Sequence, residues 1–500
     1  MNTVILPFFL PLLTATLLLL LPPGKPRRWL AALSAFAQLV VAIAFVVACS
    51  GGERWVLGVG AWMPPLGIAL VIDLLAAIML FLSSAMAFGC ILFGYAELPS
   101  KLDHPLRLPL WQFLVAGINL SFITGDLFNL FVAFEIMLIS SYALLTLEAN
   151  DRDIKHAYPY LAINLVGSAL FLLTTGVVYS IFGTLNYAEI SQRAAAMPGD
   201  SNVTLVALLL FFVFAIKAGV FPFYYWLPNS YPTLATPLGA FFAGMLTKVG
   251  VYVLLRMFGT VLPHDLHGVH NLMAWLAGAT MIFGVLGAIS RPFIRGILSW
   301  HILSQIGYMV LAIGLFTPFA IAACILYIIH HIIVKGTLFL IGGAASYRLK
   351  SGDDLKNMGG LFRAEPLLAA CFLLQAFSLG GVPPLSGFWG KYIIFVEGMK
   401  AGEYVLVGAA VLAGIMTLFS MLKIWNGAFW PALPANAPAQ RQPNYRLMLA
   451  IIGVYTALSI AIALGSGEVL KLSITAAETA LDQAGYIEAV LGLQGKGAGY

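Results

Sequence analysis

Long apolar segments recur along almost the whole length of this 500-residue chain. Each is close to the roughly 17–25 residues with which an α-helix crosses about 30 Å of hydrocarbon. Fourteen segments lie near residues 3–21, 28–49, 66–94, 108–124, 128–147, 157–182, 203–221, 235–258, 271–290, 296–316, 319–345, 366–397 (interrupted), 404–426 and 447–466. We therefore expect an all-α integral membrane protein with about fourteen transmembrane helices.

The composition agrees with a membrane protein, since 61% of the residues are hydrophobic and only 9% are charged. A soluble core does not need that much apolar surface. The four cysteines form no CxxC pair and have no histidine at ligand spacing, so we expect neither a disulfide nor a metal. The first apolar segment follows Met1 and Asn2 without a basic region, which indicates a retained helix and not a cleaved signal peptide.

Basic residues are divided unevenly between the two sets of loops. Loops after odd-numbered segments hold fifteen lysines and arginines, whereas loops after even-numbered segments and the tail hold five. Because basic loops stay on the cytoplasmic side, both termini are predicted to lie outside the cytoplasm. The same asymmetry explains the net charge of +5, so the charge does not indicate a nucleic-acid partner.

Six basic residues remain within the apolar segments. They are Lys217, Lys248, Arg256, Lys335, Lys391 and Lys423. Arg256 and Lys423 lie near segment ends, where long side chains can reach the interface. The other four lysines and Glu135 would together cost on the order of 10 kcal/mol if unpaired in lipid. That cost favours a function, although each residue alone is also compatible with a buried ion pair that fixes helix packing.

Two of the acidic residues inside predicted helices are candidates for a function. Glu135 is a candidate for proton transfer, although the neighbouring Ser140, Ser141 and Tyr142 could satisfy a structural carboxyl. Asp73 is a weaker candidate, because it lies close to the outer end of its segment, where water can reach it.

The stretch LYIIHHIIVKGTLF (326–339) places three titratable groups in one apolar segment. Tyr327, His331 and Lys335 follow i, i+4 and i+8 spacing and share one helix face. His330 points about 100° away, as expected from about 3.6 residues per turn, and is interpreted as a packing residue. A histidine titrates near neutrality and burial disfavours a lysine's charge, so His331 and Lys335 can hold or pass a proton.

Two pairs of segments indicate an internal repeat. FEIMLISSYALL (134–145) aligns with WHILSQIGYMVL (300–311) at an offset of 166, which places His301 opposite Glu135. KAGVFPFYYWLP (217–228) aligns with LGGVPPLSGFWGKY (379–392) at an offset near 162. The copies start five segments apart, so the second crosses the membrane in the opposite sense.

Prolines at matching places should interrupt the seventh and twelfth helices near mid-membrane, at Pro222 and at Pro383–Pro384. Broken helices in matching positions of two halves are typical of an ion site. The chain then divides into an N-terminal three-helix segment (1–106), a first repeat (107–260), a second repeat (271–426), and a last helix with its tail (427–500).

These residues suggest a proton relay within the membrane. If Glu135 lies near Lys217, separating the two would lower the lysine's affinity for its proton. That proton could move towards Lys248, on to His331 and Lys335, and finally to Lys391, with His301 in a matching role in the second half. Such a lateral chain requires water wires between the sites.

At these residues the chain resembles the antiporter-like membrane subunits shared by respiratory complex I, membrane-bound hydrogenases and the Mrp multisubunit cation/proton antiporters. The resemblance covers roughly residues 60–430. It is carried, in order, by FEIMLISSYALL, IKAGVFPFYYWLP, MLTKVGVYVLLR, SWHILSQIGYM, HHIIVKGTLFL and GVPPLSGFWGKY. GIALVIDLLAAIML and the length near 500 residues most resemble the D-type subunits of the Mrp antiporters, a subgroup of this family. Trp300 stands where this subgroup leads us to expect a tyrosine.

The resemblance implies fourteen transmembrane helices with two inverted five-helix repeats. The family's functional glutamate, lysines and histidine fall on Glu135, Lys217, Lys248, His331, Lys335 and Lys391. It further implies the plasma membrane of a bacterium, partner membrane subunits in a hetero-oligomeric complex, and transport of H⁺ and Na⁺.

Three functions remain open from the sequence. The first is a proton-translocating subunit of a multisubunit Na⁺/H⁺ antiporter, which is a secondary transporter and not an enzyme. The second is a proton-pumping subunit of NADH:quinone oxidoreductase or a membrane-bound hydrogenase; the chain carries no haem, flavin or iron–sulfur motif, so we expect no cofactor here and any redox centre in a partner. The third is a scaffold whose charges only lock helices together.

Overall fold

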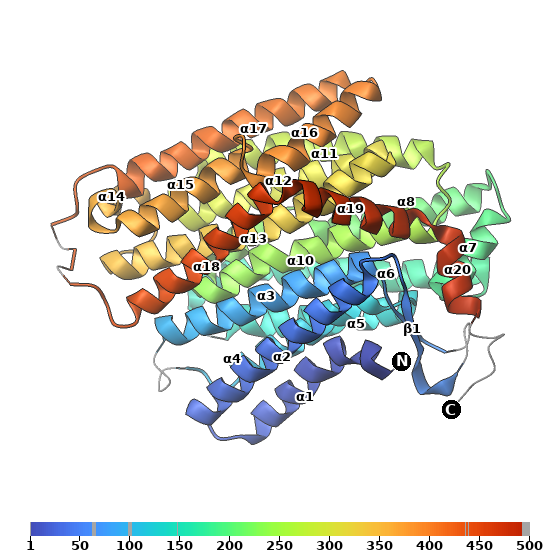
Figure 1. Ribbon diagram of the computed structural model, residues 1–500, viewed down its shortest axis with the longest axis horizontal. Coiled ribbons are helices and arrows are strands. Elements are labelled where there is room, and N and C mark those ends of the chain that lie inside the picture. Colours follow the sequence, from blue (N-terminus) through green and yellow to red (C-terminus); the bar gives the residue numbers. More distant parts are fainter. Residues whose placement is uncertain are drawn as a thin grey trace.

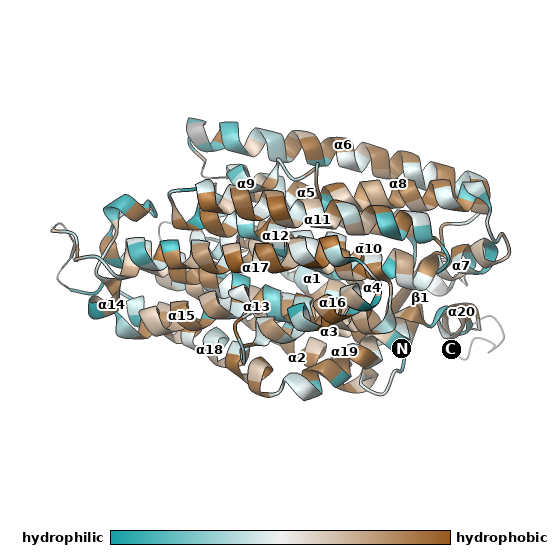
Figure 2. Ribbon diagram, turned by 90° about the horizontal axis from the view of Figure 1, so that it is seen from above, coloured by the Kyte–Doolittle hydropathy of each residue, from teal (hydrophilic) through white to brown (hydrophobic). Residues whose placement is uncertain are grey.

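The computed structural model describes residues 2–62, 67–98, 103–147, 149–435, 437–438 and 440–492. The helices run side by side in one bundle, and the first helical turn lies at the same end as the last helix, α20 (Figures 1 and 2). Residues 493–500 of the predicted tail lie outside the described residues.

The long helices correspond to the predicted apolar segments. They are α1 (Leu6–Leu20), α2 (Lys25–Cys49), α3 (Leu74–Glu97), α4 (Arg107–Ile123), α5 (Leu127–Thr146), α6 (Asp151–Phe182), α8 (Ser201–Ala218), α10 (Thr236–Arg256), α11 (His267–Ser290), α12 (Ile294–Leu315), α13 (Pro318–Leu349), α15 (Pro366–Gly380), α16 (Ser386–Lys400), α17 (Tyr404–Ile424) and α18 (Tyr445–Leu464). Shorter helices are α7 (Tyr187–Ala195), α9 (Leu227–Ser230), α14 (Leu361–Ala364), α19 (Ser466–Leu481) and α20 (Gln483–Leu491). The prediction of an all-α membrane protein is confirmed, with twelve helices among the described residues long and apolar enough to span a membrane and two shorter apolar helices, α4 and α15.

The prediction of a helix from residue 66 is wrong at its start. Strand β1 (Trp55–Gly58) pairs antiparallel with β2 (Ala69–Ile72), with Trp55 opposite Ile72. The helix begins only at Leu74, because the Asp73 carboxylate caps it by accepting a hydrogen bond from the Ala76 N–H.

Both predicted helix breaks are present, and each begins before its prolines. Helix α8 ends at Ala218, followed by Gly219 with φ +77°, and the Val220 N–H bonds to the Ala215 carbonyl. Helix α15 ends at Gly380, followed by Gly381 with φ +88°. There the Val382 N–H bonds to the Phe377 carbonyl in the same way. A left-handed glycine of this kind is the usual helix stop.

Helices α10 and α13 pack against each other at the centre of the bundle and are buried along their length. Outer helices such as α6 and α17 leave much of their apolar surface exposed, which is drawn brown in Figure 2. An apolar exterior is the surface that faces lipid. The two central helices carry three of the predicted charges and both histidines of the 326–339 stretch.

Candidate functional site

Lys217 lies in the last turn of α8 and is 4% exposed. Its ammonium donates to the Asn164 carbonyl and to the Ser168 hydroxyl, both at 3.1 Å, so helix α6 holds it. The charge of Glu135 acts on Lys217, but no ion pair joins them among the described side chains. The predicted proximity is therefore present without direct contact.

Glu135 projects from α5, and its Oε1 is buried without a hydrogen-bond partner in the part of the chain described. Ser141 does not satisfy it, because its hydroxyl donates to the Leu138 carbonyl and lies 2.7 Å from the Tyr160 hydroxyl. An unpartnered buried carboxyl oxygen is unusual for a group that only fixes packing.

Lys248 is fully buried in α10. Its ammonium donates to the Ala243 carbonyl at 2.6 Å and to the Thr247 hydroxyl at 3.3 Å, both within its own helix. Among the described side chains no acidic group forms an ion pair with it.

On α13, His331 and Lys335 are fully buried. Both ring nitrogens of His331 and the Lys335 ammonium have no hydrogen-bond partner among the described residues. Lys335 follows His331 by one turn of α13, and α13 packs against α10, the helix that carries Lys248. The structure thus brings together the groups that the sequence predicted for the middle of the relay.

A chain of polar side chains in the second half was not predicted as a whole. His301 Nε2 bonds to the Ser420 hydroxyl, and His301 Nδ1 lies 3.3 Å from Ser304 Oγ. Gln305 donates to the same Ser304 oxygen at 2.8 Å and accepts from the Tyr327 hydroxyl. The polar pair Ser-Gln inside SWHILSQIGYM is the sequence signal that could have indicated it.

Lys391 lies beside the second helix break. Its ammonium donates to the carbonyls of Leu379 at 2.8 Å and Gly380 at 3.1 Å, which are the last two residues of α15. It also lies 4.7 Å from the ring centre of Tyr308, a cation–π contact. Carbonyl groups at the end of the broken helix thus accept hydrogen bonds from a charged side chain.

His330 also contacts this break. Its Nδ1 lies 2.8 Å from Ser386 Oγ, and that oxygen lies 2.9 Å from Ser378 Oγ. His330 Nε2 has no partner among the described residues. No motif or spacing indicated this contact, since it depends on how α13 and α16 pack.

Asp73 was expected to be wet, and this is wrong. It is fully buried, and both its oxygens accept hydrogen bonds from Arg256, at 2.6 and 2.8 Å. Arg256 is 4% exposed and does not reach an interface, because Asp73 neutralises it inside the protein. This pair is separate from the lysines described above.

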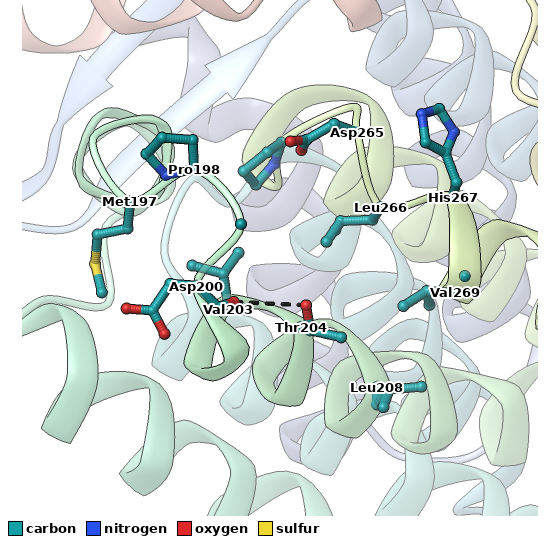
Figure 3. Close-up of a pocket in the computed structure, with 13 residues that line it drawn as sticks. Met197, Pro198, Asp200, Val203, Thr204, Leu208, Asp265, Leu266, His267 and Val269 are labelled. Carbon is teal, nitrogen blue, oxygen red and sulfur yellow. Dashed lines mark hydrogen bonds between the residues drawn. The ribbon is translucent and has the colours of Figure 1, made fainter.

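One pocket lies away from these charges. It has a volume of about 420 Å³ and is formed by the loop that leads into α8 and the loop that leads into α11. Figure 3 shows Asp200, Asp265 and His267 at its rim, with Val203 and Leu208 below.

Together these groups form a buried series of bases and hydroxyls from α8 through α10 and α13 to α16. Amines, imidazoles and hydroxyls can accept a proton on one side and release one on the other. Within the described residues, no group of three or more His, Cys, Asp or Glu side chains is arranged to hold a metal ion. Groups of these kinds are able to hold and transfer protons.

Comparison with known proteins gives consistent matches. Residues 124–417 match the family described as NADH:quinone oxidoreductase/Mrp antiporter, transmembrane. The D-type Na⁺/H⁺ antiporter subunit of Alkalihalophilus pseudofirmus is 39% identical over 98% of this chain and 99% of its own. A chain in the structure of the Mrp complex from Dietzia sp. DQ12-45-1b is 31% identical with a TM-score of 0.91, covering 98% of this chain and 100% of its own.

A chain of the membrane-bound sulfane sulfur reductase, an archaeal respiratory membrane complex, has a TM-score of 0.88 at 23% identity. It covers 98% of this chain and all of its own, and it shows a shared fold. The resemblance read from the motifs, including that to the D-type subunits, is confirmed by these matches.

Proposed function

The chain belongs to the NADH:quinone oxidoreductase/Mrp antiporter transmembrane family, and from this premise we propose that it is the proton-translocating subunit of a multisubunit Na⁺/H⁺ antiporter. The observation that carries the proposal is the line of buried bases, Lys217, Lys248, His331, Lys335 and Lys391, none of which forms an ion pair among the described residues. Ionisable groups inside a membrane are costly to keep and usually mark a pathway for ions or protons.

In the proposed mechanism Glu135 controls Lys217. When the carboxylate approaches, it stabilises the proton on the lysine, and when it withdraws, that proton moves towards Lys248. The α6 groups that hold Lys217, the Asn164 carbonyl and the Ser168 hydroxyl, keep it in place without adding a charge. His331 and Lys335 receive the proton next, and Lys391 delivers it at the second break.

The matching breaks at Gly219 and Gly381 support two inverted repeats with the boundaries 107–260 and 271–426. The subunit lies in the cell membrane as a multi-pass protein with both termini outside the cytoplasm, as the basic loops indicate. It works with other membrane subunits, as expected from the antiporter and complex that its relatives' names describe. It acts as a transporter subunit and not as an enzyme.

A proton-pumping subunit of a redox complex is the second candidate, and the family description, which includes NADH:quinone oxidoreductase, favours keeping it. Neighbouring genes distinguish the two functions. Genes for small membrane subunits alone support the antiporter, whereas genes for iron–sulfur and flavin subunits support the redox complex.

The test is Na⁺/H⁺ exchange by the whole complex in vesicles, with the two ions followed separately. We expect Lys217→Ala to abolish proton movement and, through coupling, sodium movement, while the complex still assembles. Lys400→Ala is the matched control, because that lysine is 68% exposed and pairs with Glu397 at the surface. Exchange at the wild-type rate in Lys217→Ala would support the scaffold instead.

A further inference from the structure

The contact between His330 and the second helix break points to a role that spacing on the helix does not suggest. His330 is fully buried and lies on α13, next to His331. Its Nδ1 is 2.8 Å from the hydroxyl of Ser386, the first residue of α16. Ser386 in turn lies 2.9 Å from Ser378, in the last turn of α15. One imidazole thus joins α13 to both halves of the broken helix.

We propose that His330 passes protons from the buried charges of α10 and α13 to the broken helix that carries Lys391, by way of Ser386. This inference rests on the proposed function and identifies the residue that connects its last two sites. His331, which shares a face with Lys335, then belongs to the central sites, and His330 forms the outlet from them.

The surroundings of the ring fit a relay. The Tyr327 ring lies 5.2 Å from that of His330, centre to centre, and its hydroxyl continues to Gln305. A Cβ added to Gly387 would lie 2.7 Å from His330 Nε2, so the imidazole sits directly against the first turn of α16. The free Nε2 can accept a proton, since it has no partner among the described residues.

The step is balanced as a transfer of one proton. With Nδ1 donating to Ser386, a proton that binds Nε2 makes the ring an imidazolium. The Nδ1–H bond then breaks as its proton passes to Ser386 Oγ, and Ser386 releases its own hydroxyl proton to Ser378. Ser378 in turn releases its hydroxyl proton towards the neutral amine of Lys391, which becomes the ammonium. Ser378 precedes Leu379 and Gly380, whose carbonyls hold the Lys391 ammonium. A turn of the ring and of the hydroxyls restores the starting tautomer.

A packing role and a relay role predict different results for His330→Asn. The asparagine amide places a donor about where Nδ1 lies, so the bond to Ser386 remains, but the side chain no longer binds a proton at neutral pH. We expect Na⁺/H⁺ exchange by the intact complex in vesicles to fall at least about tenfold, which is the lower range for removing a positioned proton-transfer group. Exchange at the wild-type rate in His330→Asn overturns the inference.

His104→Asn is the matched control, because His104 lies in the loop before α4 and its Nδ1 accepts from the Leu106 N–H. It should exchange ions at the wild-type rate. If His330→Asn does not assemble, Ser386 decides the question: Ser386→Ala should lower exchange and Ser386→Thr, which keeps the hydroxyl, should restore it. Ser386→Ala at the wild-type rate overturns the inference.

The test of His330 can fail without the proposed antiport function failing, and the two failures can be told apart. If the wild-type complex does not exchange Na⁺ for H⁺, the proposed function fails before any variant is compared. If the wild type exchanges and Lys217→Ala does not, while His330→Asn behaves as wild type, only the role of His330 is wrong.

Discussion

At the scale of the residue, Glu135 and Lys217 show how charges can be near each other without neutralising each other. Lys217 donates its hydrogen bonds to α6, and the Glu135 carboxylate keeps an unpartnered oxygen among the described groups. A carboxylate bonded directly to the lysine would have favoured its protonated form throughout. A carboxylate at a distance can still change that state when it moves.

Replacing Glu135 with glutamine tests this point. Glu135→Gln keeps the shape of the side chain and removes its charge, so the switch on Lys217 is lost. We expect Na⁺/H⁺ exchange in vesicles to fall about tenfold or more with assembly intact. Glu468→Gln, at an exposed pair with Lys471, is the control and should leave exchange unchanged. Wild-type exchange in Glu135→Gln across the pH range would contradict the switch.

The Asp73–Arg256 ion pair is expected to stabilise the fold, in contrast to the lysines proposed to carry protons, which form no ion pair among the described residues. Both side chains are buried and joined by two hydrogen bonds, so Asp73→Asn leaves a buried arginine without its counter-ion. We expect a loss of about 3–5 kcal/mol in stability, seen as a lower melting temperature of the purified complex.

Asp482→Asn is the comparison for Asp73→Asn. Asp482 is half exposed and pairs with Arg54, so its loss should cost about 0–1 kcal/mol. A hydrogen bond from the Gly485 N–H and the charge of Arg54 lower the pKa of Asp482, so the pair is complete at neutral pH and weakens only as the pH falls through that pKa. Equal melting temperatures for the two variants would contradict the structural role of Asp73.

At the scale of the element, the broken helices place charges where a continuous helix could not. In an unbroken helix the carbonyls of Leu379 and Gly380 would accept bonds from the following turn. Because the chain turns at Gly381 instead, those carbonyls are free to accept from Lys391. Helices α15 and α16 therefore form this site together, and the position of Lys391 depends on the backbone conformation between them.

Gly381, which follows α15, and Gly402, which follows α16, allow the effect of the break on Lys391 to be distinguished from backbone strain alone. Gly381 and Gly402 both have positive φ, +88° and +79°, so an alanine at either costs about 1–2 kcal/mol. At Gly381 the new Cβ would also lie 2.9 Å from Lys391 Cδ, whereas at Gly402 no atom lies within 4 Å.

Gly381→Ala should therefore displace Lys391 and lower Na⁺/H⁺ exchange several-fold, whereas Gly402→Ala should keep exchange near the wild-type rate. The measurement is vesicle exchange normalised to assembled complex. Similar exchange in both variants would show that the break does not position Lys391 for transport.

At the scale of the whole molecule, the bundle separates an apolar exterior from a polar interior. Helices α10 and α13 are shielded on all sides and carry Lys248, His330, His331 and Lys335. The C-terminal helices close one end of the bundle: the Thr260 hydroxyl donates to the Ala480 carbonyl, and Gln483 donates to that of Leu262. The C-terminal segment that forms α19 and α20 is only weakly apolar in sequence, but these hydrogen bonds make it part of the packed structure.

The sequence by itself determined the membrane-spanning segments, the two breaks and the charged residues within them. These follow from hydropathy, from the limits of proline and from the cost of charge in lipid, which all act locally. The strand pair before α3 was missed, because a short apolar run reads equally well as the start of a helix.

Only the tertiary structure decided the partners of those charges. Lys217 bonds to residues about fifty positions away, Asp73 to one 183 positions away, and His330 to Ser386 on another helix. Helix α13 carries apolar residues on every side, so its sequence does not show which face meets which neighbour. Rotation and register are set by how helices fit together, and these place His330 against the break.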